Sequence, residues 1–217
     1  MTKRITFAVA LAAAAFAGTA AQAATNIEFG TGTVDADVDG VADNWTINGG
    51  KAIIPTNGQL PSTYAPNTAA GRWITPVEGA GTAAPGLYNF KGFVNLSNVG
   101  NEQSWAVTWW ADNIVRAILV NGTQIFTGLG SNLSQDFREP GISQLFTNNV
   151  WITGNNEIEF IIENGPGTTG NPVALKMTSV INAVPEPGTW MLMILGLGAV
   201  GFAMRRRQST AVRFQFA

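Results

Sequence analysis

The 217-residue sequence contains no cysteine and no histidine. Without cysteine the chain has no disulfide and no thiolate nucleophile, so its stability must come from packing, and any metal must be held by oxygen ligands. The absence of histidine removes the Ser-His-Asp triad, the usual zinc sites and the commonest acid-base group near neutral pH. Most hydrolase mechanisms are thereby excluded, and we expect a protein that is not an enzyme and has no cofactor other than a structural calcium ion.

Basic residues are scarce outside the two ends of the chain. Residues 24–184 carry six lysines and arginines against thirteen carboxylates, a net charge of −7, whereas the whole chain has a formal charge of −2. A surface of this sign repels polyanions such as DNA. We therefore expect no nucleic-acid partner.

The amino terminus has the three parts of a secretory signal peptide. Lys3 and Arg4 precede an uncharged apolar stretch, and Ala21-Gln22-Ala23 forms an A-x-A cleavage site before Ala24. An amphipathic first helix is no alternative, because this stretch has no polar face. We expect export, removal of residues 1–23 by signal peptidase, and a mature chain that begins at or near Ala24.

The body, residues 24–184, has the length of one domain and can bury about 70% of its unfolded surface. Short runs rich in Val, Ile, Trp, Phe and Thr are bounded by Gly, Asn and Pro. This pattern predicts an all-β sandwich or barrel. The expected strands are RWITP (72–76), GLYNFKGFVNL (86–96), SWAVTWWA (104–111), VRAILV (115–120), TQIFTG (123–128), NEIEFIIEN (156–164) and VALKMTSVIN (173–182).

Two dipeptides in the centre of the body predict tight turns. Asp112-Asn113 and Asn121-Gly122 each separate two expected strands, and these residue types tolerate the positive φ angles of hairpin turns. We therefore expect two antiparallel hairpins in series. Alternation places on one face of the first strand Trp105, Val107 and Trp109.

Acidic residues alternate with apolar ones in residues 156–164. Glu157, Glu159 and Glu163 fall on the face opposite Ile158, Phe160 and Ile162. This is typical of the solvated side of a sandwich sheet. The alternative is a catalytic carboxylate pair, which would make the protein a glycan-active hydrolase.

The segment DADVDGVADNW places four acids within nine residues, around a glycine: Asp35, Asp37, Asp39 and Asp43. Their spacing matches the first part of a calcium loop, although Thr46 stands where the closing glutamate would be. Four neighbouring acids repel one another unless they are solvated or bind a cation. A structural calcium site and a solvated acidic turn are therefore both open.

The tryptophans suggest sugar binding, because indole faces stack on pyranose rings. Alternation assigns most of them to the core. Trp45 is the one that we expect to be exposed, and we predict it as a glycan contact. Ligand-binding loops are expected at residues 30–45, at Asp112-Asn113 and at residues 165–172, which have the composition of exposed loops.

The order of segments in the body resembles a known family. FGTGTVDADVDGVADNWTI, RWITP, APGLYNFKGFVNL, WWADNIVRAILVNG and TGNNEIEFIIENGPG are similar to the galactose-binding-like jelly-roll domains of exported bacterial proteins of the PEP-CTERM class. The resemblance implies a galactose-binding-like jelly-roll β-sandwich over residues 24–184. A fold of this kind does not by itself establish a ligand.

The carboxyl terminus resembles the sorting signal of the same class, in its PEPxxWA variant. Pro185-Glu186-Pro187 is followed by Trp190, and Met191 stands where the variant usually has alanine. The uncharged residues 188–204 would span about 25 Å as a helix, against about 30 Å of hydrocarbon. The three arginines after them, which should stay in the cytoplasm with the tail 208–217, are Arg205, Arg206 and Arg207.

The resemblance implies that this transmembrane helix is a temporary anchor in the inner membrane. An exosortase-type membrane peptidase would cut near residues 185–187 and pass the protein to the cell envelope or the extracellular matrix. The alternative is a permanent tail anchor, because the pattern of residues fits both. At its destination we expect a structural, adhesive or weakly carbohydrate-binding role, with an extracellular polysaccharide as partner.

Overall fold

The computed structural model describes residues 25–97, 99, 102–128, 136–147, 149–165, 171–184 and 187–207. Ala24–Val184 forms one compact unit. Within its described residues lie a short 3₁₀ turn, η1 (Glu78–Ala80), and ten strands: β1 (Thr25–Gly30), β2 (Val41–Ile47), β3 (Gly50–Ile53), β4 (Gly86–Leu96), β5 (Glu102–Asp112), β6 (Ile114–Val120), β7 (Thr123–Thr127), β8 (Ile142–Phe146), β9 (Gly154–Asn164) and β10 (Ala174–Val184).

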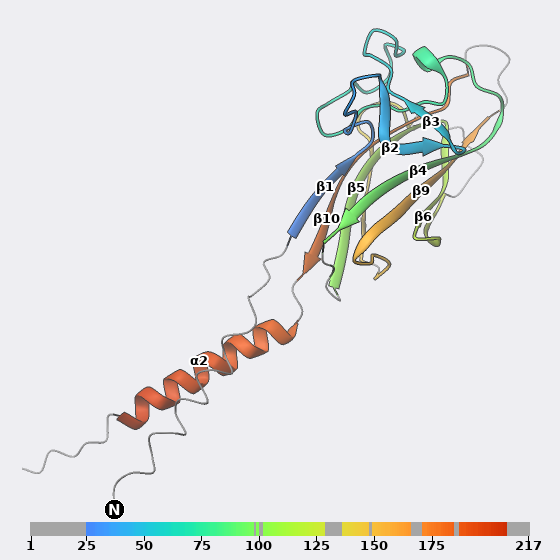
Figure 1. Cartoon of the computed structure of the whole chain (residues 1–217). Helices are drawn as coiled ribbons and strands as arrows, with labels where there is room; N and C mark the ends of the chain where they lie inside the picture. Colours follow the sequence, from blue (N-terminus) through green and yellow to red (C-terminus); the bar gives the residue numbers. More distant parts are fainter. Residues whose placement is uncertain are drawn as a thin grey trace, which may run out of the picture. The chain divides into compact units, whose positions relative to one another are not determined.

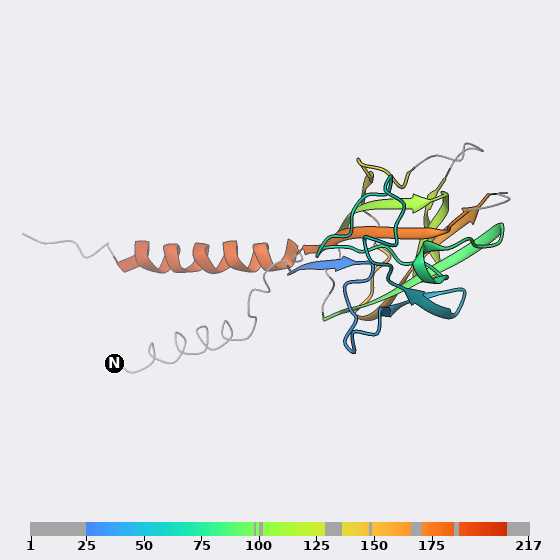
Figure 2. The same ribbon diagram turned by 90° about the horizontal axis from the view of Figure 1, so that it is seen from above.

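The strands form two antiparallel sheets that pack face to face. One sheet has the order β1-β10-β5-β8, and the other has the order β3-β2-β4-β9-β6-β7. Figure 1 shows β1, β10 and β5 side by side, and Figure 2 shows the two layers from above. The predicted all-β fold and its sandwich architecture are confirmed.

The core lies between the two sheets and follows from alternation along the strands. Trp105 and Trp109 of β5 are fully buried, and both pack edge-on against Phe160 of β9, with ring centroids 6.4 and 6.1 Å apart. Ile158 and Ile162 flank Phe160 on the same buried face. The predicted apolar faces of both strands are therefore confirmed.

One expected strand is wrong. Of RWITP, Ile74 makes a single bridge to Leu175 of β10, and Thr75 makes a single bridge to Ile53 of β3. These two partners belong to different sheets. The segment crosses from one sheet to the other, so it cannot extend a pairing with either.

The two expected hairpins have different outcomes. β6 and β7 pair directly through Asn121 and Gly122, whose φ angles are 50° and 77°, so this hairpin is confirmed. The hairpin at Asp112-Asn113 is wrong, because β5 and β6 lie in different sheets. Both edges of β5 are already occupied by β10 and β8. The Asp112-Asn113 turn therefore carries the chain across the core.

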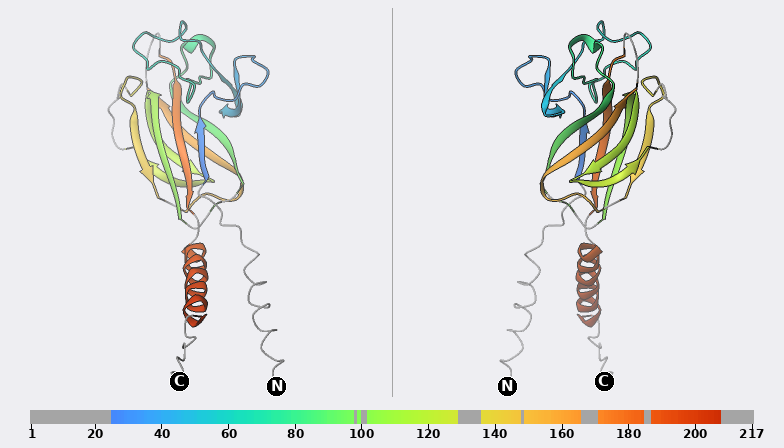
Figure 3. Two further views of the ribbon diagram at one scale, coloured as in Figure 1. Left: turned by 90° about the vertical axis from the view of Figure 1, so that its left-hand side faces the viewer. Right: turned by 90° about the vertical axis from the view of Figure 1, so that its right-hand side faces the viewer.

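The loops of the sandwich are distributed unequally between its two ends. The long connection from β3 to β4 lies at one end, and β1 begins and β10 ends at the opposite end (Figure 3). Part of this connection folds back over the four-stranded sheet, where Lys176 Nζ of β10 donates a hydrogen bond to the carbonyl of Pro66 at 2.7 Å. Residues 55–73, the covering loop, divide that face into a covered part and an open part.

Candidate functional site

The outer face of the four-stranded sheet consists of rows of side chains that cross the strands. Antiparallel partners point to the same face, so the register defines these rows. In the first row Lys176 lies opposite Trp110. The second row is Gly30, Thr178, Thr108 and Ser143, and the third is Glu28, Val180, Ala106 and Leu145.

The covering loop buries the first row. Tyr64, Ala65 and Trp73 of this loop form a second apolar cluster with Trp110 and Ala174, separate from the main core. The rings of Tyr64 and Trp73 lie 4.7 Å apart, and the Trp73 indole N–H donates to the Ala65 carbonyl at 2.6 Å. The loop is thus held to the sheet by aromatic packing.

Lys176 is buried beneath the covering loop, with a side chain that is 2% exposed. Its Nζ lies 4.0 Å from the centre of the Trp110 ring and donates to the Pro66 carbonyl at 2.7 Å. Burial lowers the pKa of Lys176, and Glu139 Oε1, 4.0 Å away, opposes that effect. The ammonium group therefore fastens the loop and does not reach solvent.

Asp112 is a second buried polar group under the same loop, and it is 5% exposed. Tyr64 O–H and the Asn113 side-chain amide both donate to its carboxylate. Burial raises the pKa of Asp112 more than the Tyr64 hydrogen bond lowers it, and burial together with Asp112 raises the pKa of Tyr64. The expectation of an exposed ligand loop at Asp112-Asn113 is wrong, because Asp112 is buried and bonded to Tyr64 of the covering loop.

The second and third rows remain open and form a cleft of about 840 Å³. Its boundary is set where the covering loop packs directly on the sheet. A Cβ atom on Gly30 would clash with the Ala70 carbonyl, and one on Gly71 would lie 2.5 Å from the Met177 carbonyl. Ala69, Ala70 and Thr33 line the cleft beside this contact, and the two rows line its floor.

The lining of the cleft is rich in hydroxyl groups. Thr108 Oγ1 and Ser143 Oγ lie 2.8 Å apart, and within the described residues the Thr178 hydroxyl has no hydrogen-bond partner. Leu145, 63% exposed, adds an apolar edge. Hydroxyl groups both donate and accept hydrogen bonds. The arrangement suits a ligand that itself carries hydroxyls and apolar C–H faces.

Trp45 does not contribute to this site, and its predicted exposure is wrong. Its side chain is 2% exposed, it stacks on Phe29 with ring centroids 5.6 Å apart, and its indole N–H donates to the Gly30 carbonyl at 3.3 Å. Gly92 lies against one ring face, where an added Cβ would be 2.6 Å away. Both ring faces are therefore covered, because β2 pairs with β4 and faces the core.

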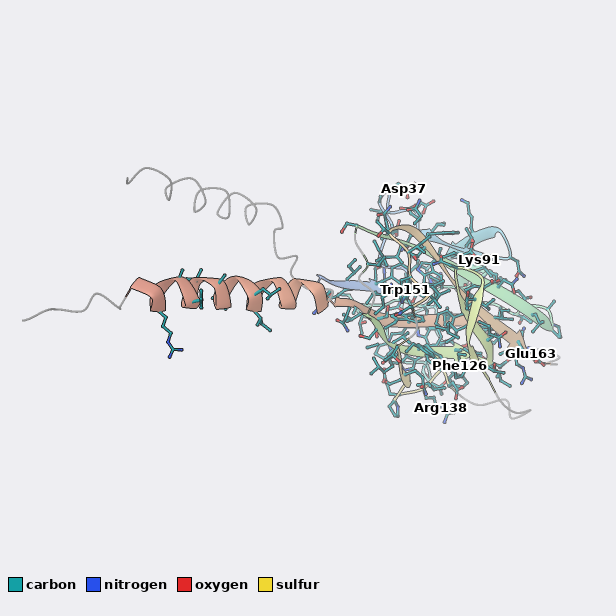
Figure 4. All side chains as sticks on the ribbon, turned by 90° about the horizontal axis from the view of Figure 1, so that it is seen from below. Asp37, Lys91, Phe126, Arg138, Trp151 and Glu163 are labelled. Carbon is teal, nitrogen blue, oxygen red and sulfur yellow. The ribbon has the colours of Figure 1, made fainter. Side chains whose placement is uncertain are left out.

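The acidic loop brings three of its four aspartates together. Carboxylate oxygens of Asp35, Asp37 and Asp39 lie within 4.8 Å of one another, and Figure 4 shows Asp37 at the edge of the sandwich. Asp43 instead accepts a hydrogen bond from Ala36 N–H at 2.7 Å. Oδ1 of Asp35 is buried and has no partner among the described residues. The donor set and this unpaired oxygen fit a cation that prefers oxygen ligands.

The glutamates of β9 lie on the outer face of the six-stranded sheet and form ion pairs. Lys91 Nζ is 2.9 Å from Glu157 Oε1 and 3.8 Å from Glu159 Oε2, and Arg116 Nε is 2.5 Å from Glu163 Oε2. All five side chains are partly exposed, and Figure 4 labels Lys91 and Glu163. This agrees with the predicted solvated face.

The sequence pattern did not single out the residues of the cleft. Glu28 alternates with Ile27 and Phe29 in TNIEFG, which is a recognisable strand pattern with one outward acid. Its row partner Val180 is far away along the chain, and only the pairing of β1 with β10 brings them together. The alternation could have identified the outward positions but not their common site.

The carboxyl-terminal segment forms α2 (Pro187–Arg207). Met193, Leu195, Phe202 and Met204 are among its exposed apolar side chains. In the part of the chain that the structure describes, no helix is long and apolar enough to cross a membrane. Pro185 and Glu186, and the signal-cleavage residues Ala21, Ala23 and Ala24, lie outside the described residues, as do the side chains of Trp190, Arg206 and Arg207.

The sorting signal is supported by a family comparison. Residues 183–207 match the model of the PEP-CTERM protein-sorting motif. This motif implies export, processing by an exosortase and sorting to the cell surface. No curated protein matches the chain in a sequence comparison.

The sandwich resembles carbohydrate-binding modules among solved structures. A family 35 module from Clostridium thermocellum is 15% identical, with a TM-score of 0.37 over 72% of this chain and 97% of the module. A family 4 module is 20% identical, with a TM-score of 0.31 over 61% of this chain and 86% of the module. A GH31 α-xylosidase from Xanthomonas citri is 10% identical, with a TM-score of 0.22 over 66% of this chain and 16% of the enzyme.

Proposed function

We propose that the sandwich is a non-catalytic module that binds an extracellular polysaccharide weakly through the cleft on its four-stranded sheet. The observation that carries the proposal is the open cleft of about 840 Å³, with its hydroxyl-rich second row beside the apolar edge at Leu145. Sugar hydroxyls exchange hydrogen bonds with Thr and Ser, and sugar C–H faces pack on Ala, Val and Leu. Among the described residues that line the cleft no aromatic ring is exposed to stack on a sugar, so we expect a low affinity.

A glycan-active hydrolase is the alternative, and the cleft favours binding over catalysis. Hydrolysis of a glycosidic bond requires two carboxyl groups about 5 to 9 Å apart on either side of the bond. Among the described residues that line the cleft, Glu28 is the single carboxylic acid. The glutamates of β9 lie on the other sheet and are paired with Lys91 and Arg116. We therefore assign binding, not bond cleavage, to this face.

The strand order supports the jelly-roll topology that the resemblance implies. Without the β2–β3 hairpin, each sheet keeps four strands, in the orders β1-β10-β5-β8 and β4-β9-β6-β7. In each order the strands from the two halves of the chain alternate, as they do when a long hairpin rolls up into two Greek keys. We propose a galactose-binding-like jelly roll with the β2–β3 hairpin as an addition at the edge of one sheet.

The sorting motif sets the place where this binding would act. We propose that the carboxyl-terminal segment that matches the sorting motif retains the precursor at the inner membrane until an exosortase cuts near residues 185–187. The released sandwich then acts at the cell envelope or in the extracellular matrix, where it is adhesive or structural. A retained tail anchor is the alternative.

Removal of the two central hydroxyls tests the binding site. In Thr108→Val/Thr178→Val both side chains keep their shape and their strand preference, and only the hydroxyls are lost. One hydrogen bond contributes about 0.5 to 1.5 kcal/mol, so we expect about tenfold weaker retention on an immobilised polysaccharide panel. The control is Thr46→Val, on β2 of the other sheet. Equal retention of both variants would contradict a site in this cleft.

A further inference from the structure

The charge of the cleft points to the class of polysaccharide that it binds. Among the described residues that line it, Glu28 is the one ionisable side chain, and this residue is exposed. Within the described residues no cation lies within ion-pairing distance of the Glu28 carboxylate. The floor otherwise presents hydroxyl and aliphatic groups, so one uncompensated negative charge dominates the cleft.

Within residues 24–184, no basic side chain balances the charge of Glu28. The six basic residues of the body all lie in the described part of the chain, and none of them lines the cleft: Lys51, Arg72, Lys91, Arg116, Arg138 and Lys176. Lys176 is closest to it in register, two positions from Thr178, but it is buried under the covering loop. The body residues that the structure does not describe contain no lysine or arginine.

An anionic sugar is therefore disfavoured at this site. A uronate, sulfate or phosphate group normally pairs with Arg or Lys, and here it would face Glu28 within a body of net charge −7. A ligand that carries ammonium groups would instead form an ion pair with the Glu28 carboxylate. The row register places Glu28 on edge strand β1 and Leu145 on edge strand β8, about 14 Å apart across the sheet.

We infer that the cleft selects an amine-bearing polysaccharide, such as a partly deacetylated amino-sugar polymer, and that Glu28 is the residue that determines this preference. The ammonium group pairs with Glu28 in the third row, while hydroxyls of the same or the next sugar bond to Thr178, Thr108 and Ser143 in the second. This inference rests on the proposed polysaccharide binding and names the chemical class of the polysaccharide.

The test compares three polymers that share one backbone. Full-length protein in a nonionic detergent is measured by biolayer interferometry on immobilised glycol chitosan, which carries amines, glycol chitin, which is neutral, and carboxymethyl chitin, which is acidic. We expect the order amine, neutral, acidic at about 0.1 M salt, and a smaller difference in high salt because the pair is partly exposed.

Glu28→Gln isolates the proposed residue. It keeps the shape of the side chain and removes its charge, and we expect binding to the amine polymer to weaken about fivefold, with no loss on the neutral polymer. Glu78→Gln is the matched control: it removes the same charge from an exposed acid of η1 that does not line the cleft. The control separates the effect of the protein's net charge on binding from the effect of the charge in the cleft.

Three results would overturn the inference. Equal weakening by Glu28→Gln and Glu78→Gln would assign the preference to net charge alone. Equal or tighter binding of the acidic polymer would contradict selection for amines. In both cases binding of the neutral polymer, and its loss in Thr108→Val/Thr178→Val, would leave the proposed function standing. Failure of all three polymers to bind would contradict the proposed function and this inference together.

Discussion

Thr25, the first residue of β1, pairs with Ala183 near the end of β10. β1 follows directly on the predicted signal cleavage site, and Ala183 is the first residue matched by the sorting motif. The two ends of the sandwich domain therefore leave its four-stranded sheet side by side. The sorting motif also overlaps the sheet, since Val184 still pairs with Glu102 of β5.

This pairing predicts a specific cross-link. The chain has no cysteine, so Thr25→Cys/Ala183→Cys introduces the sole pair of thiols. Antiparallel partners lie about 4.5 to 5.5 Å apart at Cα, which is within disulfide range. We expect oxidation to form an intramolecular disulfide, seen as a loss of two hydrogens by mass spectrometry. Thr25→Cys/Thr178→Cys, five pairs further along the register, should stay reduced; a disulfide there would contradict the register.

Sorting is tested at the motif itself. Replacing Pro185, Glu186 and Pro187 by alanine removes two prolines, a residue type that favours the extended backbone that a peptidase can bind. We expect the wild-type envelope form to end near residues 185–187, and the variant to remain intact to Ala217, by intact-mass measurement. Arg213→Ala, which lies beyond residues 183–207, should be processed normally. An envelope form of the wild type that still ends at Ala217 would argue for a tail anchor.

The acidic loop predicts calcium-dependent stability. If the carboxylates of Asp35, Asp37 and Asp39 hold a calcium ion, a hundredfold excess over Kd stabilises the fold by about 2.7 kcal/mol. We expect a chelator to lower Tm and added calcium to restore it, measured by differential scanning fluorimetry. Asp37→Asn should abolish this difference, while Glu78→Gln should retain it. A wild-type Tm that neither the chelator nor added calcium changes would show that the loop is a solvated turn without calcium.

The contact between Trp45 and Gly92 predicts a strong effect on stability. Trp45→Ala empties a fully buried site and should lower the free energy of unfolding by about 3 to 5 kcal/mol in urea. Gly92→Ala should also destabilise, because its Cβ would lie 2.6 Å from Trp45 Cζ2. Gly58→Ala, with no atom within 4 Å of the added Cβ, is the control. Unchanged stability of Gly92→Ala would contradict this packing.

We expect the free energy of unfolding to depend on pH through the buried carboxyl group of Asp112. Burial raises the pKa of its carboxyl, so the stability that it contributes is complete below its ordinary value of 3.8 and is lost as the pH rises through the raised pKa. Asp112→Asn cannot ionise. We therefore expect the free energy of unfolding of the wild type, relative to this variant, to fall as the pH rises above about 4. A difference that is constant from pH 3 to 8 would contradict the buried carboxylate.

The partner of Asp112 gives an independent check. Tyr64→Phe removes the hydrogen bond to a buried carboxylate and should lower stability by about 1 to 3 kcal/mol. Tyr88→Phe is the matched control, since the Tyr88 hydroxyl donates to the Ala84 carbonyl at an exposed position. We expect a smaller loss there, measured by urea denaturation at the same pH. Equal losses would show that the hydrogen bond from Tyr64 to Asp112 does not stabilise the covering loop.

Local patterns in the sequence determined much of the secondary structure of this protein and its sorting motif. A run of strand-forming residues bounded by turn residues gave the bounds of β4. Alternation gave the buried face of β9, because a strand with one face in the core must place every second residue inward. Asn121-Gly122 gave a hairpin because both residues accept positive φ. The sorting motif is equally local, since its order of segments is readable without any tertiary contact.

The tertiary structure decided what local rules leave open. Asp112-Asn113 has the composition of a hairpin turn, but β5 is bonded on both sides by β10 and β8, so β6 had to join the other sheet. Trp45 was buried by the pairing of β2 with β4, and Lys176 by a loop about 110 residues earlier in the chain. The cleft unites residues of β1, β5, β8 and β10. Alternation fixes which residues share a face, but long-range burial of apolar surface selects which strands become neighbours.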